Sequence, residues 1–404
     1  MTVEAMMASE LLLFAELLPE CLVATLSPVS KAAVRQQADI RIFEGETAVE
    51  DAAPVWLELQ AAGAVPTPFQ TLAFARRASG VHLRQGEIPR IAAVYQDGRP
   101  VALSATVLSR VSGVPAVRFL GDPLSQYGDA VICKTARREH LQALWHEMAN
   151  PKRSSLVMLR RVRACSRFAP VLQAHAKVLN DEQAPFIALG LDHQISSHER
   201  REQSRRNRRL AEAGAVSIDI INAPQAAEAV AEAINFKLAW LAERGLPSSV
   251  LGHAGWQATL IDMAKDPDAP LTVVKLSVAG VTAAMEVAFT HGGNWLAFLG
   301  ATNPAFAKAG PGHIQMEKTI AHCRAANFNA YDLLAPNDAY KSKIATGCVA
   351  VRDFAAALDA RGHMALWTAS LMPAAKSAVT ALPRDVRRVV VSRLAKSFLA
   401  APVK

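Results

Sequence analysis

The chain has 404 residues, of which 51 % are apolar and 20 % are charged, and its net charge is +8. This length accommodates about two domains, and the composition is that of a globular protein rather than a disordered or fibrous one. No apolar stretch approaches the roughly 20 residues of a membrane-spanning helix. The first segment has no Lys or Arg before Lys31, so it lacks the basic start of a secretory signal. We therefore expect a cytoplasmic protein.

The positive charge is concentrated in two segments. Residues 198–209 contain six Arg and two Glu, and residues 376–404 contain seven basic residues and one Asp. The remainder is close to neutral, which favours local contacts with anions. The Arg segment is either a solvated helix or a contact for a cofactor phosphate, a phosphate-linked carrier, tRNA or a membrane; it lacks the interleaved aromatics of most nucleic-acid sites, so we do not expect nucleic acid. The amphipathic tail, residues 371–404, either packs on the protein or contacts the inner face of an anionic membrane.

Residues 1–37 are expected to form an N-terminal extension, followed by a first domain over residues 38–190. The sheet of this domain is expected to begin with a meander of three consecutive strands, which are joined by turns. We then expect a helix and a further strand. The expected strands are RIAAVYQ (90–96), VALSATVLS (101–109), AVRFLG (116–121) and SSLVMLRRV (154–162), and the helix is TARREHLQALWHEM (135–148).

A second domain, expected over residues 191–370, repeats the order of the first. A helix over residues 226–245 carries Val230, Ile234, Leu238 and Leu241 on one stripe. The chain is therefore predicted to be an α+β fold used twice by internal duplication; the alternative is a chance likeness between two mixed α/β segments. The predicted strands are LTVVKLSV (271–278), VTAAMEVAFT (281–290), NWLAFLGA (294–301) and FNAYDLLA (328–335).

The third strand of the second half leads into the loop and helix GATNPAFAKAGPGHIQMEKTIAHC (300–323). Gly310 and Gly312 permit positive φ and close approach of a ligand, whereas Pro311 has no N–H to donate. The amides of Gly310, Gly312 and His313, together with the helix dipole, are predicted to hold a phosphate. An ordinary turn is the alternative. The first half lacks this G-x-G pattern, so we expect it to act as a platform for the other substrate.

This order of strands, glycine loop and helix resembles the core of GNAT acyltransferases, whose loop binds the pyrophosphate of acetyl-CoA. The usual loop begins with Gln or Arg, but Ala307 stands there in this chain, and Lys308 is the candidate replacement charge. A more specific resemblance, over residues 40–360, is to double-GNAT proteins of the CelD-like and Fem-like group. It is carried by AGPGHIQMEKTIAHCRAANFNAYDLLAPNDAYKSKIATG, RREQSRRNRRLAEAGAVSIDI and FLGDPLSQYGDAVI.

The resemblance implies an N-acyltransferase that moves an acyl group, acetyl in the simplest case, from acyl-CoA to an amine. The CelD-like branch is associated with cellulose and exopolysaccharide synthesis, which suggests an acceptor that is a small molecule or is linked to a glycan or lipid. The Fem-like branch instead transfers amino acids from aminoacyl-tRNA to cell-wall precursors. A non-catalytic scaffold of a polysaccharide synthase, anchored by the basic tail, is a third hypothesis.

Acyl transfer needs a group that protonates the leaving thiolate and groups that stabilise charge. By resemblance, Tyr340 is the candidate acid; packing against the cofactor or in the core is its alternative. Lys341 could neutralise phosphate or an oxyanion, or it could be a solvated helix residue. Asp332 lies among apolar residues, where an unpaired carboxylate is costly. We expect it to pair with Lys341 or Lys343, or to orient the amine.

The amine must also lose a proton, for which Glu286 is the candidate general base; a solvent-facing strand residue is the alternative. His291 and His313 are weaker candidates. In the first half, Tyr127 and Asp129 are expected to line an acceptor groove. The five cysteines contain no C-x-x-C motif, so no metal site is expected. Motifs of serine hydrolases, zinc peptidases, NTPases and dinucleotide-binding enzymes do not occur in the required context.

Overall fold

The computed structural model describes residues 39–190, 197–246, 248 and 250–368. The predicted N-terminal extension, residues 1–37, and the predicted basic tail, residues 371–404, lie outside these residues. The membrane contact predicted for the tail therefore remains a prediction. Within the described residues, no helix combines the length and apolarity that crossing a membrane would require.

The first half begins with an edge strand and helices, and a meander, a helix and a further strand follow. Its strands are β1 (Asp39–Glu44), β2 (Ile88–Gln96), β3 (Arg99–Val111), β4 (Val114–Phe119), β5 (Val131–Ile132), β6 (Leu156–Arg163) and β7 (Lys177–Ala188). Its helices are α2 (Ala48–Asp51), α3 (Ala53–Ala61), the 3₁₀ helix η1 (Pro68–Gln70), α4 (Leu72–Arg84), α5 (Arg138–Met148) and α6 (Ala169–His175).

The second half repeats this order after the Arg-rich helix. Its strands are β8 (Val216–Asn222), β9 (Leu271–Val278), β10 (Val281–His291), β11 (Asn294–Thr302), β12 (Ala330–Asp332) and β13 (Gly347–Ala357). Its helices are α7 (Ser197–Ala211), α8 (Ala227–Arg244), α9 (Ala254–Met263), the 3₁₀ helix η2 (Pro304–Ala309), α10 (Pro311–Ala325) and α11 (Ala339–Ile344). The predicted meanders and their helices are confirmed, to within a few residues at their ends.

The strands of both halves form one sheet with the order β1-β2-β3-β4-β6-β13-β7-β12-β11-β10-β9-β8. The pairs β4/β6 and β11/β12 are parallel, whereas the other neighbours along this order are antiparallel. A parallel pair needs a crossover connection, which α5 provides in the first half and α10 in the second. The fold is therefore α+β, with two GNAT-like domains in tandem, each a mixed and mostly antiparallel sheet flanked by helices.

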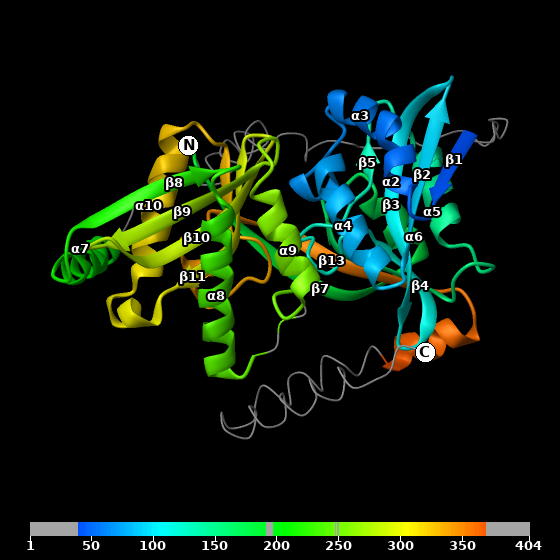
Figure 1. Ribbon diagram of the computed structural model, residues 1–404. Helices are drawn as coiled ribbons and strands as arrows, with labels where there is room; N and C mark the ends of the chain where they lie inside the picture. The colour runs from blue at the N-terminus through cyan, green and yellow to red at the C-terminus, as the bar shows by residue number, and fades with distance from the viewer. Residues whose placement is uncertain (1–38, 191–196, 247, 249, 369–404) are drawn as a thin grey trace, which may run out of the picture.

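The last strand of each half crosses to the other half. β7 follows β6 in the chain but pairs with β12, and β13 follows β12 in the chain but pairs with β6. The two exchanged strands also pair with each other and lie at the centre of the molecule (Figure 1). The domain boundaries predicted at residues 190 and 370 remain predictions, and the sheet itself continues from one half into the other.

Helices cover both faces of the second half, so its strands are more buried than the alternating pattern suggests. Met285 and Val287 of β10 pack in the same cluster as α8, whereas Ala284 packs with Ile314 of α10. In Figure 1, α8 lies in front of the strands and α10 behind them. Successive side chains of β10 therefore face different helices.

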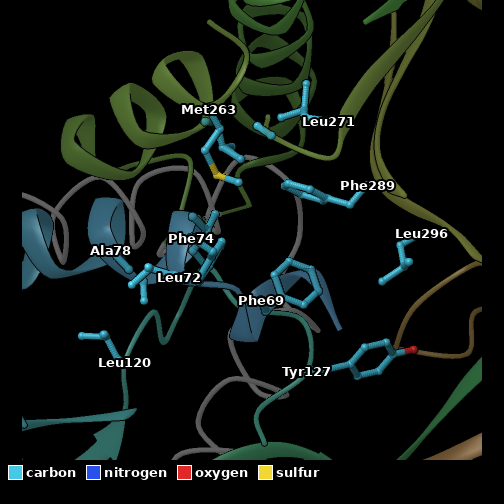
Figure 2. Close-up of a cluster of buried hydrophobic side chains, with 14 of the residues drawn as sticks. Phe69, Leu72, Phe74, Ala78, Leu120, Tyr127, Met263, Leu271, Phe289 and Leu296 are labelled. Atoms are coloured by element: carbon cyan, nitrogen blue, oxygen red, sulfur yellow. The ribbon is translucent and has the colours of Figure 1, made fainter. Parts of the chain in front are cut away.

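A hydrophobic core joins the two halves (Figure 2). Phe69 of η1 lies at its centre, with its ring centroid 5.4 Å from that of Phe289 and 5.5 Å from that of Phe74. These contacts bring β10 of the second half against η1 and α4 of the first. The buried junction explains why the halves are held in one arrangement around the cavity described below.

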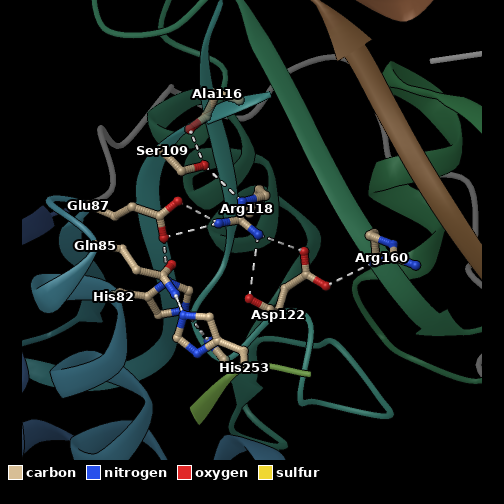
Figure 3. A network of polar contacts seen from close by, with 10 residues as sticks. His82, Gln85, Glu87, Ser109, Ala116, Arg118, Asp122, Arg160 and His253 are labelled. Atoms are coloured by element: carbon tan, nitrogen blue, oxygen red, sulfur yellow. Dashed lines mark hydrogen bonds and ion pairs between the residues drawn. The ribbon is translucent and has the colours of Figure 1, made fainter. Parts of the chain in front are cut away.

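A polar network reinforces the first half beside this core (Figure 3). Arg118 pairs with Glu87 at 2.8 Å and with Asp122 at 3.1 Å. Glu87 also contacts Nδ1 of the buried His82 at 2.5 Å. The Nε2 atom of His82 accepts a hydrogen bond from the Gly121 amide, so the proton of the neutral ring lies on Nδ1.

Candidate active site

The candidate site forms where β11 and β12 separate. The two strands pair only from Asn294 to Leu296 and from Ala330 to Asp332, while β11 continues to Thr302. A cavity of about 770 Å³ opens beyond the last pair, with walls from β10, β11, α8, α10 and α11. A cavity of this size accommodates a small molecule or cofactor.

The predicted glycine loop lies at one end of this cavity, which Gly310, Gly312 and His313 line. Gly310 has φ +65° and caps the N-terminus of α10, so the expected need for glycine is met. Its own N–H donates to the Ala307 carbonyl at 3.3 Å, and the His313 N–H donates to the Gly310 carbonyl at 3.2 Å. The prediction that all three amides are available is therefore wrong, and Gly312 is the amide of the three that remains a candidate donor.

The cation that the structure brings to this loop is Arg206 of α7. A Cβ atom placed on Gly310 would lie 3.8 Å from Cδ of Arg206, and α7 contacts both η2 and α10. Burial lowers the pKa of His313, and the positive charge of Arg206 lowers it further. Lys308, the predicted replacement charge, is exposed on η2, whereas Arg206 is partly buried; both lie outside the described residues that line the cavity.

Glu286 of β10 lines the cavity and is only 4 % exposed, so the solvent-facing alternative is wrong. Its carboxylate accepts hydrogen bonds from Nε1 of Trp295 at 2.8 Å, Nε2 of Gln315 at 3.3 Å and the hydroxyl of Tyr331 at 2.5 Å. Burial raises the pKa of Glu286, and these three donors oppose the rise. A carboxylate has about four lone-pair positions, so three donors leave one for a ligand proton, and Glu286 remains a candidate general base.

Tyr340 and Lys341 lie at the start of α11 and line the same cavity. Tyr340 is 46 % exposed, which excludes the core alternative, and its ring lies edge-on to His313 at 6.3 Å. Lys341 is 8 % exposed, so it is not a solvated helix residue. Its Nζ donates to the carbonyls of Leu334 and Pro336, each at 2.9 Å, which ties α11 to the chain that leaves β12.

Asp332, Tyr127 and Asp129 lie elsewhere. The carboxylate of Asp332 accepts hydrogen bonds from the Tyr127 hydroxyl at 2.8 and 3.0 Å, so its partner is Tyr127 rather than the expected Lys341 or Lys343. Tyr127 is 2 % exposed and Asp129 is 7 % exposed. The expectation that these two side chains line an open groove is therefore wrong. The weaker candidate His291 bonds the Val65 carbonyl across the junction at 3.0 Å.

Sequence reasoning missed a β-bulge in the cavity wall. Val287 pairs with Leu299 and Ala288 pairs with Ala297, which leaves Phe298 as an extra residue of β11. Such a residue falls outside the regular ladder of backbone hydrogen bonds. Sequence reasoning also missed Tyr331 and Gln315. Both donate hydrogen bonds to Glu286, which is distant from them in the sequence. Their spacing carries no signal, although a buried Glu in an apolar strand indicates that donors must lie nearby.

A family model matches part of the chain. Residues 197–342 match the model of the acetyltransferase (GNAT) domain. The second half therefore contains a GNAT acetyltransferase domain. The GNAT fold implies acyl-CoA as the co-substrate, and the matched segment extends from α7 to α11, so it contains the glycine loop, Glu286 and Tyr340.

Two solved structures share the fold of most of the chain. One is the C-terminal domain of a putative lysylphosphatidylglycerol synthetase from Agrobacterium fabrum, with 12 % identity, 79 % of this chain and 96 % of that chain covered, and a TM-score of 0.51. The other is FemX, with 12 % identity, coverage of 74 % and 95 %, and a TM-score of 0.50. No curated protein sequence matches the chain. At this identity, the two structures support the fold alone.

Proposed function

We propose that the cavity of the second half holds acyl-CoA and that the protein transfers the acyl group, acetyl in the simplest case, to an amine. The observation that carries this proposal is the single cavity that connects the N-terminus of α10 with Glu286 and Tyr340. A donor whose phosphates lie at α10 would extend its thioester towards the separation of β11 and β12. We therefore propose that the second half binds the donor and that the first half, whose Gln126 lines the same cavity, contributes to the acceptor site.

The donor phosphates would be held by the amide of Gly312, the dipole of α10 and the guanidinium of Arg206. Helix N-termini favour anions because their first amides have no partner within the helix. An arginine adds a charge-assisted bond to phosphate. Lys308 is the weaker of the two candidate cations, because its exposed position favours solvent.

The chemical step would proceed by direct attack of the amine. Glu286, directly or through a water molecule, accepts a proton from the amine. The amine nitrogen then forms a bond to the thioester carbon, and the carbon–sulfur bond breaks. The Phe298 amide is the candidate donor to the thioester oxygen, and Tyr340 is the candidate proton donor to the leaving thiolate. Lys341 positions the chain beside the site through its bonds to the carbonyls of Leu334 and Pro336. Asp332 does so through its bond from Tyr127.

The acceptor that the CelD-like resemblance favours is an amino sugar of an envelope or extracellular polysaccharide, free or linked to a glycan or lipid. This reaction would take place in the cytoplasm, at the inner face of the membrane where the precursor is membrane-bound. A Fem-like transfer from aminoacyl-tRNA is the second candidate. The observation that favours it is α7, which contacts α10 and η2 and exposes Arg205, Arg208 and Arg209.

The experiment supplies the full chain with glucosamine and either acetyl-CoA or a mixture of aminoacyl-tRNAs, and detects products by mass spectrometry. We expect acetylated glucosamine with acetyl-CoA and no product with aminoacyl-tRNA. The reverse result would establish the Fem-like candidate. A protein that is inactive with both donors, and whose biological role is lost when residues 371–404 are removed, would instead be a scaffold.

A further inference from the structure

A cluster of cations lies on the wall of the cavity that α8 provides. Lys237, Trp240 and Arg244 line the cavity, and their spacing places them on one stripe of the helix. The guanidinium carbon of Arg244 lies 4.2 Å from the centre of the Trp240 indole, and Nζ of Lys237 lies 4.6 Å from it. Cation–π contacts of this kind hold both long side chains in place. We call these three residues the α8 cluster.

The α8 cluster lies on a different face of the sheet from the glycine loop. Met285 of β10 packs with α8, whereas its neighbour Glu286 bonds Gln315 of α10. Both residues nevertheless line the cavity, which therefore passes between β11 and β12 from one face to the other. A donor held at the N-terminus of α10 would occupy one end, and the α8 cluster lines the end that remains for the second substrate.

The electrostatics of this end favour an anion. Burial lowers the pKa of Lys237, and the charge of Arg244 lowers it further. Burial likewise lowers the pKa of Lys341, and the positive charge of Lys237 adds to this decrease. Two carboxylates oppose this repulsion: Asp338 raises both pKa values, and Glu243 contacts Arg244 at 3.5 Å.

Both carboxylates line the cavity themselves, but each is partly engaged elsewhere. Glu243 has 59 % of its side chain exposed, so water screens most of its attraction to Arg244. Asp338 lies at the N-terminus of α11, where the helix dipole also attracts its charge. Like charges gathered in a partly buried wall raise the free energy of the protein, and an anion bound there would lower it.

We propose that the acceptor is an amine that also carries an anionic group, a phosphate or a carboxylate, which Lys237 and Arg244 bind. A phosphorylated or acidic amino sugar fits this class. Trp240 is a positioning residue that keeps the two cations directed at the anion. This inference rests on the proposed acyl transfer and adds the charge of the acceptor to it.

The test compares three amines that differ in charge: glucosamine, glucosamine 6-phosphate and muramic acid, each with acetyl-CoA. We expect kcat/KM to be at least about tenfold higher for one of the two anionic amines, because tenfold corresponds to about 1.4 kcal/mol and one charge-assisted hydrogen bond contributes at least that much. A preference for glucosamine 6-phosphate identifies a phosphate site, and a preference for muramic acid identifies a carboxylate site. Equal values for all three amines would refute the inference.

The variant K237Q/R244Q should lose this preference, so that the ratio of kcat/KM between the preferred anionic amine and glucosamine falls towards one. The matched control is Lys265→Gln, which changes an exposed lysine outside the cavity. Trp240→Phe should keep more of the preference than Trp240→Leu, since a ring is retained. A double variant that binds acetyl-CoA more weakly but treats the amines as wild type does would assign the cluster to the donor and refute the inference.

A binding measurement separates this inference from the acyl transfer on which it rests. Calorimetry with each amine and the full chain, with and without CoA, needs no turnover. Tighter binding of an anionic amine that K237Q/R244Q abolishes would support the inference, even if no acyl group were transferred. A protein that acetylates glucosamine but binds the anionic amines no more tightly would retain the proposed function and refute the charged acceptor.

Discussion

Replacing Glu286 with Gln tests the proposed general base most sharply, because the two side chains have nearly the same shape. The carboxylate accepts three hydrogen bonds, from Trp295, Gln315 and Tyr331. An amide offers one acceptor oxygen and an NH2 group that can only donate. With its oxygen directed at Trp295, the amide keeps the indole bond, and the Tyr331 hydroxyl can rotate to accept from the NH2 group. That NH2 group would then face Nε2 of Gln315, which is also a donor.

The structure sets the size of both effects. One unsatisfied buried donor costs about 1–3 kcal/mol, so the free energy of unfolding should fall by about that amount. Loss of a general base lowers the rate by about 10²–10⁴-fold. Binding of acetyl-CoA should change little, since the proposed phosphate contacts lie at Gly312 and Arg206.

The assay measures kcat, KM for acetyl-CoA and the melting temperature, with Asp129→Asn as the control. Asp129 is also a buried carboxylate with hydrogen bonds, but it lies outside the residues that line the cavity. The wild-type rate should rise as the pH passes through the raised pKa of Glu286, because the base acts only when it is ionised. The rate of Glu286→Gln should not show this rise with pH. A Glu286→Gln protein with wild-type kcat and an unchanged pH profile would refute the assigned role.

Three other predictions concern the donor site and the core. Arg206→Ala should weaken acetyl-CoA binding about 10–100-fold, from about 1.5–3 kcal/mol per charge-assisted bond, while Lys308→Ala should have little effect; equal effects in calorimetry would contradict the assignment. Burial raises the pKa of Asp129 to about 6, so the native state keeps a proton that the unfolded state has released, and stability should fall by about 3 kcal/mol as pH rises from about 3 to about 7. Urea unfolding across this range should show a flatter pH dependence for Asp129→Asn, and an unchanged slope would contradict the shift. Phe69→Ala should cost about 3–5 kcal/mol and destabilise both halves in one transition; two separate transitions in calorimetry would show that the shared core does not couple them.

The elements that sequence could predict are those that local patterns specify. The meander over residues 271–301 was predicted almost to the residue, because its alternating strands and glycine turns lie next to each other in the chain. Gly310 was also interpreted correctly as a position that needs positive φ. Periodicity and turn chemistry act over a few residues and therefore remain visible in one sequence.

The exchange of β7 and β13 between the halves could not be predicted in this way. Each strand pairs with partners that are distant in the chain, and a local pattern does not specify which edge a strand will join. The same limit applies to the site. Nothing near Glu286 in the sequence indicates Tyr331, and nothing near Gly310 indicates Arg206, because these contacts depend on the packing of separate elements. Tyr127 and Asp129 were assigned to a groove because their burial could not be seen.

The central claim is that one of the two similar halves binds acyl-CoA, at the N-terminus of α10. Calorimetric titration of acetyl-CoA into the wild-type protein, Gly312→Leu and the helical control Gly80→Leu tests it directly. A Cβ atom at Gly312 would lie 3.3 Å from Oγ1 of Thr302, whereas one at Gly80 would meet the flexible end of Arg84 at 3.4 Å. We predict one site per chain in the wild type and in Gly80→Leu, and its loss in Gly312→Leu with the fold retained. No binding to the wild type at millimolar acetyl-CoA, or unchanged binding to Gly312→Leu, would contradict the claim.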